Sequence, residues 1–189
     1  MTVFEFTFGL IAIIMGLALT DIAGSFHRLV MNRAVVRWHP LPLLAAAMAL
    51  TGVILAWWSY WSDRSHRAVT FAGLVYEVGQ ALVLYLLAAA SLPDKVDEGE
   101  GVDLGAYYDQ VRPYYMSLLA AYVLMAGPIA AVREILAGEN AWEGLFLNAG
   151  MVALFVACIF IRARWFNLLV LVSTLGLLGV RWWAIQLRG

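Results

Sequence analysis

Ionisable and amide side chains inside long apolar segments are the residues of this sequence that could do chemistry. Glu77 is the clearest, because it interrupts VTFAGLVYEVGQALVLYLL about 12 Å from the start of that segment at the rise of a helix. Gln80 follows three residues later and shares a helix face with Gly73 and Ala81. A charge at membrane depth costs about 2.5 kcal/mol or more unless it is paired or wet. The pattern therefore predicts that this face lies at a helix interface or a cavity, and not against lipid.

Arg181, in LGLLGVRWWAIQ, is the opposite charge that we expect near Glu77. If the N-terminus is outside, the two residues lie at nearly the same depth. We predict an outer-leaflet polar site made of Glu77, Gln80, Arg181, Glu5, Arg133 and Glu134. Three interpretations stay open: an ion pair that fixes the register of two helices, a permeation or binding site, or Glu77 facing water in a vestibule.

A second polar set lies near the other end of the first apolar segment. Asp21, Ser25 and Arg28 follow one helix face at i, i+4 and i+7. Asp21 is about 25 Å along the axis from Phe4, so it is expected near the inner interface. The spacing predicts an Asp21–Arg28 pair, which either holds a buried helix in place or forms an inner gate or ion site.

Enzymatic and cofactor chemistry is not expected. His27 and His39 are expected on the inner side and His66 on the outer side, so haem ligation between two helices would need the inner loop to fold back. The sequence contains no GxSxG motif, no phosphate-binding loop and no cluster of cysteine and histidine for zinc. The one lysine, Lys95, stands in an acidic loop, which excludes a retinal Schiff base inside the bundle. We expect no catalytic residue, no metal and no cofactor.

The elements that position these residues are six apolar segments. The chain is 63% hydrophobic and 13% charged, against about 25% charged in soluble domains, so its excess apolar surface must face lipid. We predict an all-α, polytopic membrane helix bundle that forms a single transmembrane domain over 1–189. The segments lie near 4–30, 41–61, 69–92, 114–136, 143–163 and 166–187.

The connections between the segments are short except for 94–112, which carries six acids and two bases and whose first part is expected to be a solvated loop. Its end, 106–115, could form a short interfacial helix, because aromatic and charged residues alternate there. Pro113 suits the first turn of the fourth segment, and Gly127-Pro128 is expected to kink it.

Basic residues indicate the orientation. With the N-terminus outside, seven lysines and arginines lie inside and five outside, which favours an N-out, C-out topology. The inner set is Arg28, Arg33, Arg37, Lys95, Arg112, Arg162 and Arg164. The net charge of −1 gives no reason to expect a nucleic-acid partner.

The stretch EFTFGLIAIIMGLALTDIAGSFHRLV, followed by WWSYW, resembles a group of small bacterial membrane proteins. These proteins begin with E-F, carry a GLALT segment with a basic end, and have a Trp-rich end to the second helix. The later SLPD and AYYDQVRPYY stretches are also similar to that group. The resemblance implies a multi-pass protein of the bacterial inner membrane with six helices, and it implies no activity and no site residues.

Two classes of function follow from these patterns. The first is a small channel or transporter for an ion or small solute. We expect it to be a homo-oligomer, because six helices with so few polar residues enclose little water alone. The second is a non-catalytic accessory subunit or lipid-binding scaffold of a larger membrane complex, which the short loops and the Trp-rich rim favour. Membrane lipid is an expected partner of either class.

Overall fold

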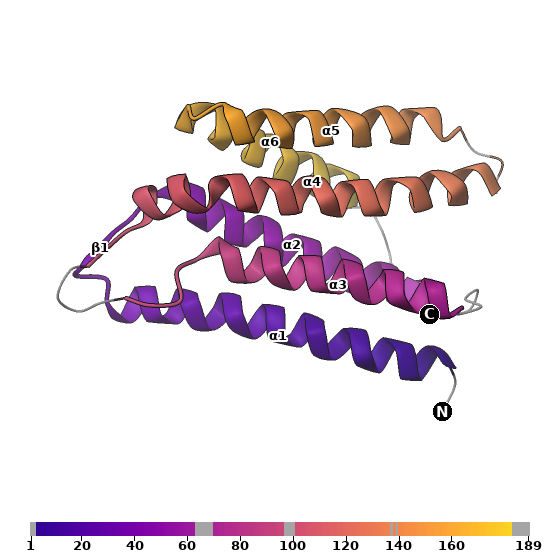
Figure 1. Ribbon diagram of the computed structural model, residues 1–189, viewed down its shortest axis with the longest axis horizontal. Helices are drawn as coiled ribbons and strands as arrows, with labels where there is room; N and C mark the ends of the chain where they lie inside the picture. The colour runs from indigo at the N-terminus through magenta and orange to yellow at the C-terminus, as the bar shows by residue number, and fades with distance from the viewer. Residues whose placement is uncertain (1–2, 63–69, 97–100, 137, 139, 183–189) are drawn as a thin grey trace.

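Six helices form the described part of the protein, which in this computed structural model covers residues 3–62, 70–96, 101–136, 138 and 140–182. They run back and forth along one long axis (Figure 1). They are α1 (Val3–Met31), α2 (Pro40–Ser62), α3 (Phe71–Ser91), α4 (Leu104–Leu136), α5 (Trp142–Phe160) and α6 (Arg164–Trp182). The all-α prediction is confirmed. The predicted end of the sixth segment, near residue 187, lies outside the described residues.

Four helices are long and apolar enough to cross a membrane: Thr7–Met31 of α1, Pro40–Trp61 of α2, Phe71–Ser91 of α3 and Trp142–Phe160 of α5. Between 11% and 39% of the residues in their most apolar windows are buried inside the protein. Most of their apolar side chains therefore face outward, as lipid requires. This surface fits an integral membrane protein. The apolar part of α6, Arg164–Val180, is shorter.

Helix packing follows the order of the chain with three exceptions: α1 on α3, α2 on α4 and α2 on α6. α1 packs on α2 and α3, α3 packs on α2 and α4, and α4 packs on α5. α6 returns to pack on α2 as well as α5. Small residues allow close approach, since a Cβ on Gly52 of α2 would lie 3.0 Å from Leu84 of α3. Between α2 and α4, the buried Tyr115 hydroxyl donates a 2.8 Å hydrogen bond to the Ala45 carbonyl.

A two-stranded parallel sheet joins the two connections at one end of the bundle. β1 (Val36–Arg37) pairs with β2 (Val102–Asp103), so that Val36 stands opposite Val102. This end, which we call the loop end, lies opposite the end where α1 begins (Figure 1). The sheet ties the chain between α1 and α2 to the chain that leads into α4.

The start of α4 corrects the sequence-based boundary. The helix begins at Leu104, not near residue 114, so the predicted loop 94–112 is helical over its second half. Asp103 caps this start, because its Oδ1 accepts hydrogen bonds from the backbone N–H of Gly105 (2.8 Å) and Ala106 (3.0 Å). The expected interfacial helix is thus the continuous first part of α4. Pro113 and Pro128 both lie inside the helix.

Candidate functional site

Glu77 lies on the face of α3 that packs into the bundle. Ala81, Leu84 and Ala88 follow it at i+4, i+7 and i+11, and all three are buried. Glu77 itself is half-buried. Leu84 meets Gly52 of α2, which shows that this face is the one turned to the neighbouring helix. A carboxyl group on such a stripe is turned away from lipid.

Tyr76, next to Glu77 in the chain, contacts α4. The Tyr76 hydroxyl donates a hydrogen bond to the Met125 carbonyl of α4. A Cβ on Gly79 would lie 3.5 Å from the Met125 methyl group, so the two helices approach closely here. Gln80, one residue further, is half-buried. The stretch 76–80 therefore presents a phenol, a carboxyl group and an amide within about one helical turn.

The other residues of the predicted outer-leaflet site lie near the end of the bundle where α1 begins. Glu5 stands exposed in the first turn of α1. Arg181 lies at the end of α6, and Arg133 and Glu134 lie in the last turns of α4 (Figure 1). The side chains of these last three residues are outside the described part of the structure. The predicted cluster of six residues remains a prediction.

Asp21 and Arg28 lie on one face of α1, as their spacing indicates, and a third charge joins them. Arg28 Nη2 donates a 2.8 Å hydrogen bond to the buried Ser25 hydroxyl and lies 3.9 Å from Asp94 Oδ1. The Asp21 carboxyl group interacts electrostatically with both Asp94 and Arg28. The sequence reading missed Asp94, which follows α3 and reaches this face because α1 and α3 are packed together.

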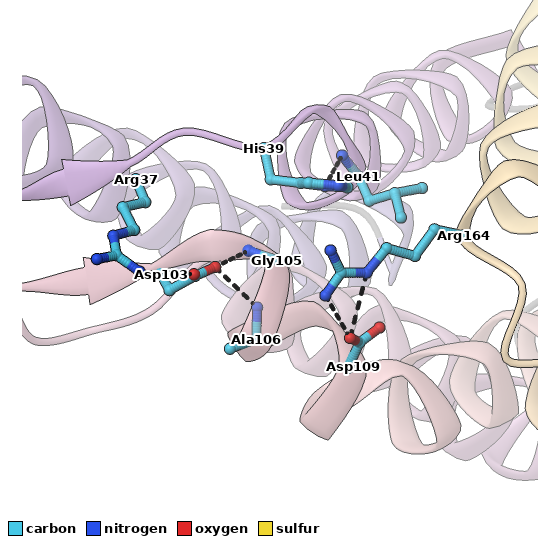
Figure 2. Close-up of polar contacts among 8 residues, drawn as sticks. All are labelled: Arg37, His39, Leu41, Asp103, Gly105, Ala106, Asp109 and Arg164. Carbon is cyan, nitrogen blue, oxygen red and sulfur yellow. Dashed lines mark hydrogen bonds and ion pairs between the residues drawn. The ribbon is translucent and has the colours of Figure 1, made fainter.

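A network of charged groups at the loop end, shown in Figure 2, was also missed. Arg164 at the start of α6 donates to Asp109 Oδ2 of α4 through Nε (3.2 Å) and Nη2 (2.6 Å). Arg37 Nη1 lies 3.9 Å from Asp103 Oδ2 across the two strands. A Cβ on Gly105 would lie 3.2 Å from Arg164 Nη1, so glycine leaves room for the arginine. The network links β1, α4 and α6.

The electrostatics of this network favour the charged forms of Arg164 and Asp103. The hydrogen bond to Asp109, followed by that carboxylate's charge, raises the pKa of Arg164 above its ordinary value. The hydrogen bond from the Ala106 N–H is the largest cause that lowers the pKa of Asp103. His39 accepts a 3.3 Å hydrogen bond from the Leu41 N–H at the start of α2 through Nδ1. These groups hold the ends of helices together and show no arrangement for proton transfer.

Arg112 is the one charged residue among those described that is classed as buried, with 4% of its surface exposed. Its Nε is enclosed without a hydrogen-bond partner. The guanidinium acts electrostatically on the Tyr108 phenol, one turn earlier in α4, and on the Cys158 thiol of α5. The Tyr108 hydroxyl donates a 3.3 Å hydrogen bond to Asn167 Oδ1. Asn167, fully buried, connects α4 to the turn between α5 and α6.

Within the described ranges, no group of three or more histidine, cysteine, aspartate or glutamate side chains could hold a metal ion. No protein-family model, curated protein or solved structure matches the chain.

Proposed function

We propose that the protein is a small channel or transporter for an ion or small solute, with Glu77 and Gln80 on its path. The observation that carries the proposal is the place of Glu77 on the buried stripe of α3 that continues through Ala81, Leu84 and Ala88. A carboxyl group in the apolar part of a bundle is costly, and such groups commonly mark ion or substrate pathways.

The chemistry of the stretch 76–80 favours a cation or a proton over an anion. A carboxylate and an amide oxygen can replace part of the hydration shell of a cation. The carboxylate repels an anion, and the amide oxygen does not bind one. Close packing of α3 against Met125 of α4 gives the path a second wall. Motion of α4 at Gly127, where a Cβ would lie 3.2 Å from Asn148 of α5, would alter that wall.

The proposal includes a place and an orientation. The basic residues Arg28, Arg37 and Arg164 lie at the loop end, and the positive-inside tendency puts that end in the cytoplasm of a bacterial cell, with the protein in the inner membrane. We further propose that copies of the chain assemble, so that polar stripes such as that of Glu77 enclose water together. Reporter fusions at the C-terminus would test the orientation.

Reconstituted vesicles test transport. The purified protein is placed in phospholipid vesicles, and entry of protons, Na⁺ or K⁺ is followed with trapped dyes. Wild-type protein is expected to carry a flux above that of empty vesicles, and Glu77→Gln is expected to reduce it about tenfold or more, since a hydrogen bond to a charged group contributes about 1.5–3 kcal/mol. Glu143→Gln is the matched control, because Glu143 is exposed in the first turn of α5.

The alternative is an accessory or lipid-binding scaffold subunit. It is favoured by the exposed aromatic side chains Trp142, Phe146 and Phe160, which run along α5. Lipid or another subunit would cover them. Wild-type vesicles without flux for all three cations, together with a monomeric protein in native mass spectrometry, would favour this function over transport.

A further inference from the structure

The charge of Arg112 has no counter-charge in the part of the chain that the structure describes. The residue is 4% exposed, and its Nε is enclosed without a hydrogen-bond partner. No carboxylate among the described residues lies within 4 Å of it, although such ion pairs form at Arg28, Arg37 and Arg164. Leaving a guanidinium buried and uncompensated is strongly unfavourable. A group that accepts a hydrogen bond from this Nε would remove that cost.

The carboxylates nearest to Arg112 along α4 are already engaged. Asp109, three residues earlier, receives two hydrogen bonds from Arg164. Asp103 accepts from two backbone N–H groups at the start of the helix and lies near Arg37. Turning either of them to Arg112 would break contacts that hold α4 to α6 or to β1. Neither of these two carboxylates is available to Arg112 without loss elsewhere.

The phenol of Tyr108 and the thiol of Cys158, on which the Arg112 guanidinium acts, are neutral at pH 7. Burial raises the pKa of the Tyr108 phenol above its ordinary value. Cys158 is a buried thiol, and thiols are ordinarily protonated at this pH. The Asn167 amide is also used, because its Nδ2 donates to the carbonyls of Ile161 (3.1 Å) and Ala163 (2.9 Å). None of these groups supplies a negative charge.

The depth of Arg112 fits a phosphate group. The residue lies level with Cys158 in the last turn of α5 and, through Tyr108, with Asn167 in the first turn of α6. Both helices end at this level, so it is close to the boundary between hydrocarbon and head groups. Guanidinium groups bind phosphate through two parallel hydrogen bonds, with more strength and geometric selectivity than lysine.

We propose that Arg112 is the centre of a binding site for a phosphate group, carried by a phospholipid head group or by free phosphate, in the seam between α4 and α5 at the loop end. This site is distinct from the Glu77 path at the other level of the bundle and does not depend on it.

Three added compounds separate the sources of the phosphate. The full-length protein is purified in dodecyl maltoside, and its thermal midpoint is measured after adding dioleoylphosphatidylglycerol, dioleoylglycerol without phosphate, or inorganic phosphate. Stabilisation by the phospholipid alone identifies a head-group site, and stabilisation by inorganic phosphate identifies a free-anion site. Equal effects of the two lipids with no effect of phosphate, or no effect of any compound, would overturn the proposal.

The Arg112→Met variant gives a second test of the phosphate site. Methionine fills the same seam without a charge, so this variant should fold at least as well as the wild type when no phosphate is present. Its apparent affinity for the phosphate compound should fall about tenfold or more, while Arg162→Gln, an exposed arginine at the same end, keeps the wild-type affinity. Wild-type affinity in Arg112→Met would refute the site. If that variant does not fold, the wild-type comparison of the three compounds still decides.

Discussion

Gly101 is the residue whose substitution should most disturb the loop end, for two separable reasons. Its φ angle is +70°, a conformation that costs residues with a Cβ roughly 1–2 kcal/mol. A Cβ at this position would also lie 2.5 Å from the Val35 carbonyl oxygen. That oxygen accepts a 3.1 Å hydrogen bond from the Val102 N–H. Moving it away would sacrifice a bond that contributes about 0.5–1.5 kcal/mol.

Gly138 separates the two effects, because it shares the backbone conformation and lacks the contact. Its φ angle is +76°, and nothing lies within 4 Å of an added Cβ. Gly138→Ala should therefore cost roughly 1–2 kcal/mol, and Gly101→Ala about 2–3 kcal/mol. Gly150→Ala, in the open middle of α5, adds helix propensity and should stabilise by about 0.5–1 kcal/mol.

The assay is unfolding of the purified protein in mixed micelles by increasing SDS, followed by the tryptophan fluorescence of the bundle. The order expected for the free energy of unfolding is Gly150→Ala, wild type, Gly138→Ala and Gly101→Ala, from highest to lowest. Equal losses for Gly101→Ala and Gly138→Ala would refute the reasoning, because the close approach of Gly101 to Val35 would then contribute nothing.

Two further substitutions test single contacts of α4. Hydrogen bonds from the N–H groups of Ala106 and Gly105 lower the pKa of Asp103, so its carboxylate form stabilises the folded state. The stabilisation is complete above the ordinary pKa of an aspartate, about 4. It is lost as the pH falls through the lowered pKa that Asp103 has in the folded state. Asp103→Asn should therefore flatten the loss of thermal stability between pH 5 and about pH 2, and parallel curves would contradict it. Tyr115→Phe removes the hydrogen bond to Ala45 and should cost about 0.5–1.5 kcal/mol of unfolding free energy in SDS titration. The exposed Tyr114→Phe is its control, and equal effects of the two would argue against a contribution from the bond.

The helices of the bundle were predictable because lipid selects long apolar runs, and such runs are visible in a single sequence. The start of α4 was not, because the first three turns of the helix carry Tyr107, Asp109 and Arg112 and resemble a solvated loop in composition. Asp103 was the available signal, as an aspartate directly before a helix accepts from its first free N–H groups.

The contacts between distant segments could not be read from the chain. Asp109 and Arg164 meet only because α6 begins beside the first turns of α4 (Figure 2). The pairing of β1 with β2 likewise depends on how the loops fold across the end of the bundle. Helical spacing placed Glu77 on one face with Ala81, which the structure shows to be buried; the role of that face stays a prediction. The burial of Arg112 depends on α5 covering it, which no local pattern encodes.

The proposed transport role of Glu77 is tested most directly by the initial rate of cation entry into vesicles that contain equal amounts of wild-type, Glu77→Asp or Glu77→Gln protein. Because the proposal places a carboxylate on the path, Glu77→Asp should keep a measurable part of the wild-type rate of cation entry. Glu77→Gln should lower that rate about tenfold or more. A rate in Glu77→Gln equal to that of the wild type, for protein folded as judged by its SDS unfolding curve, would contradict it.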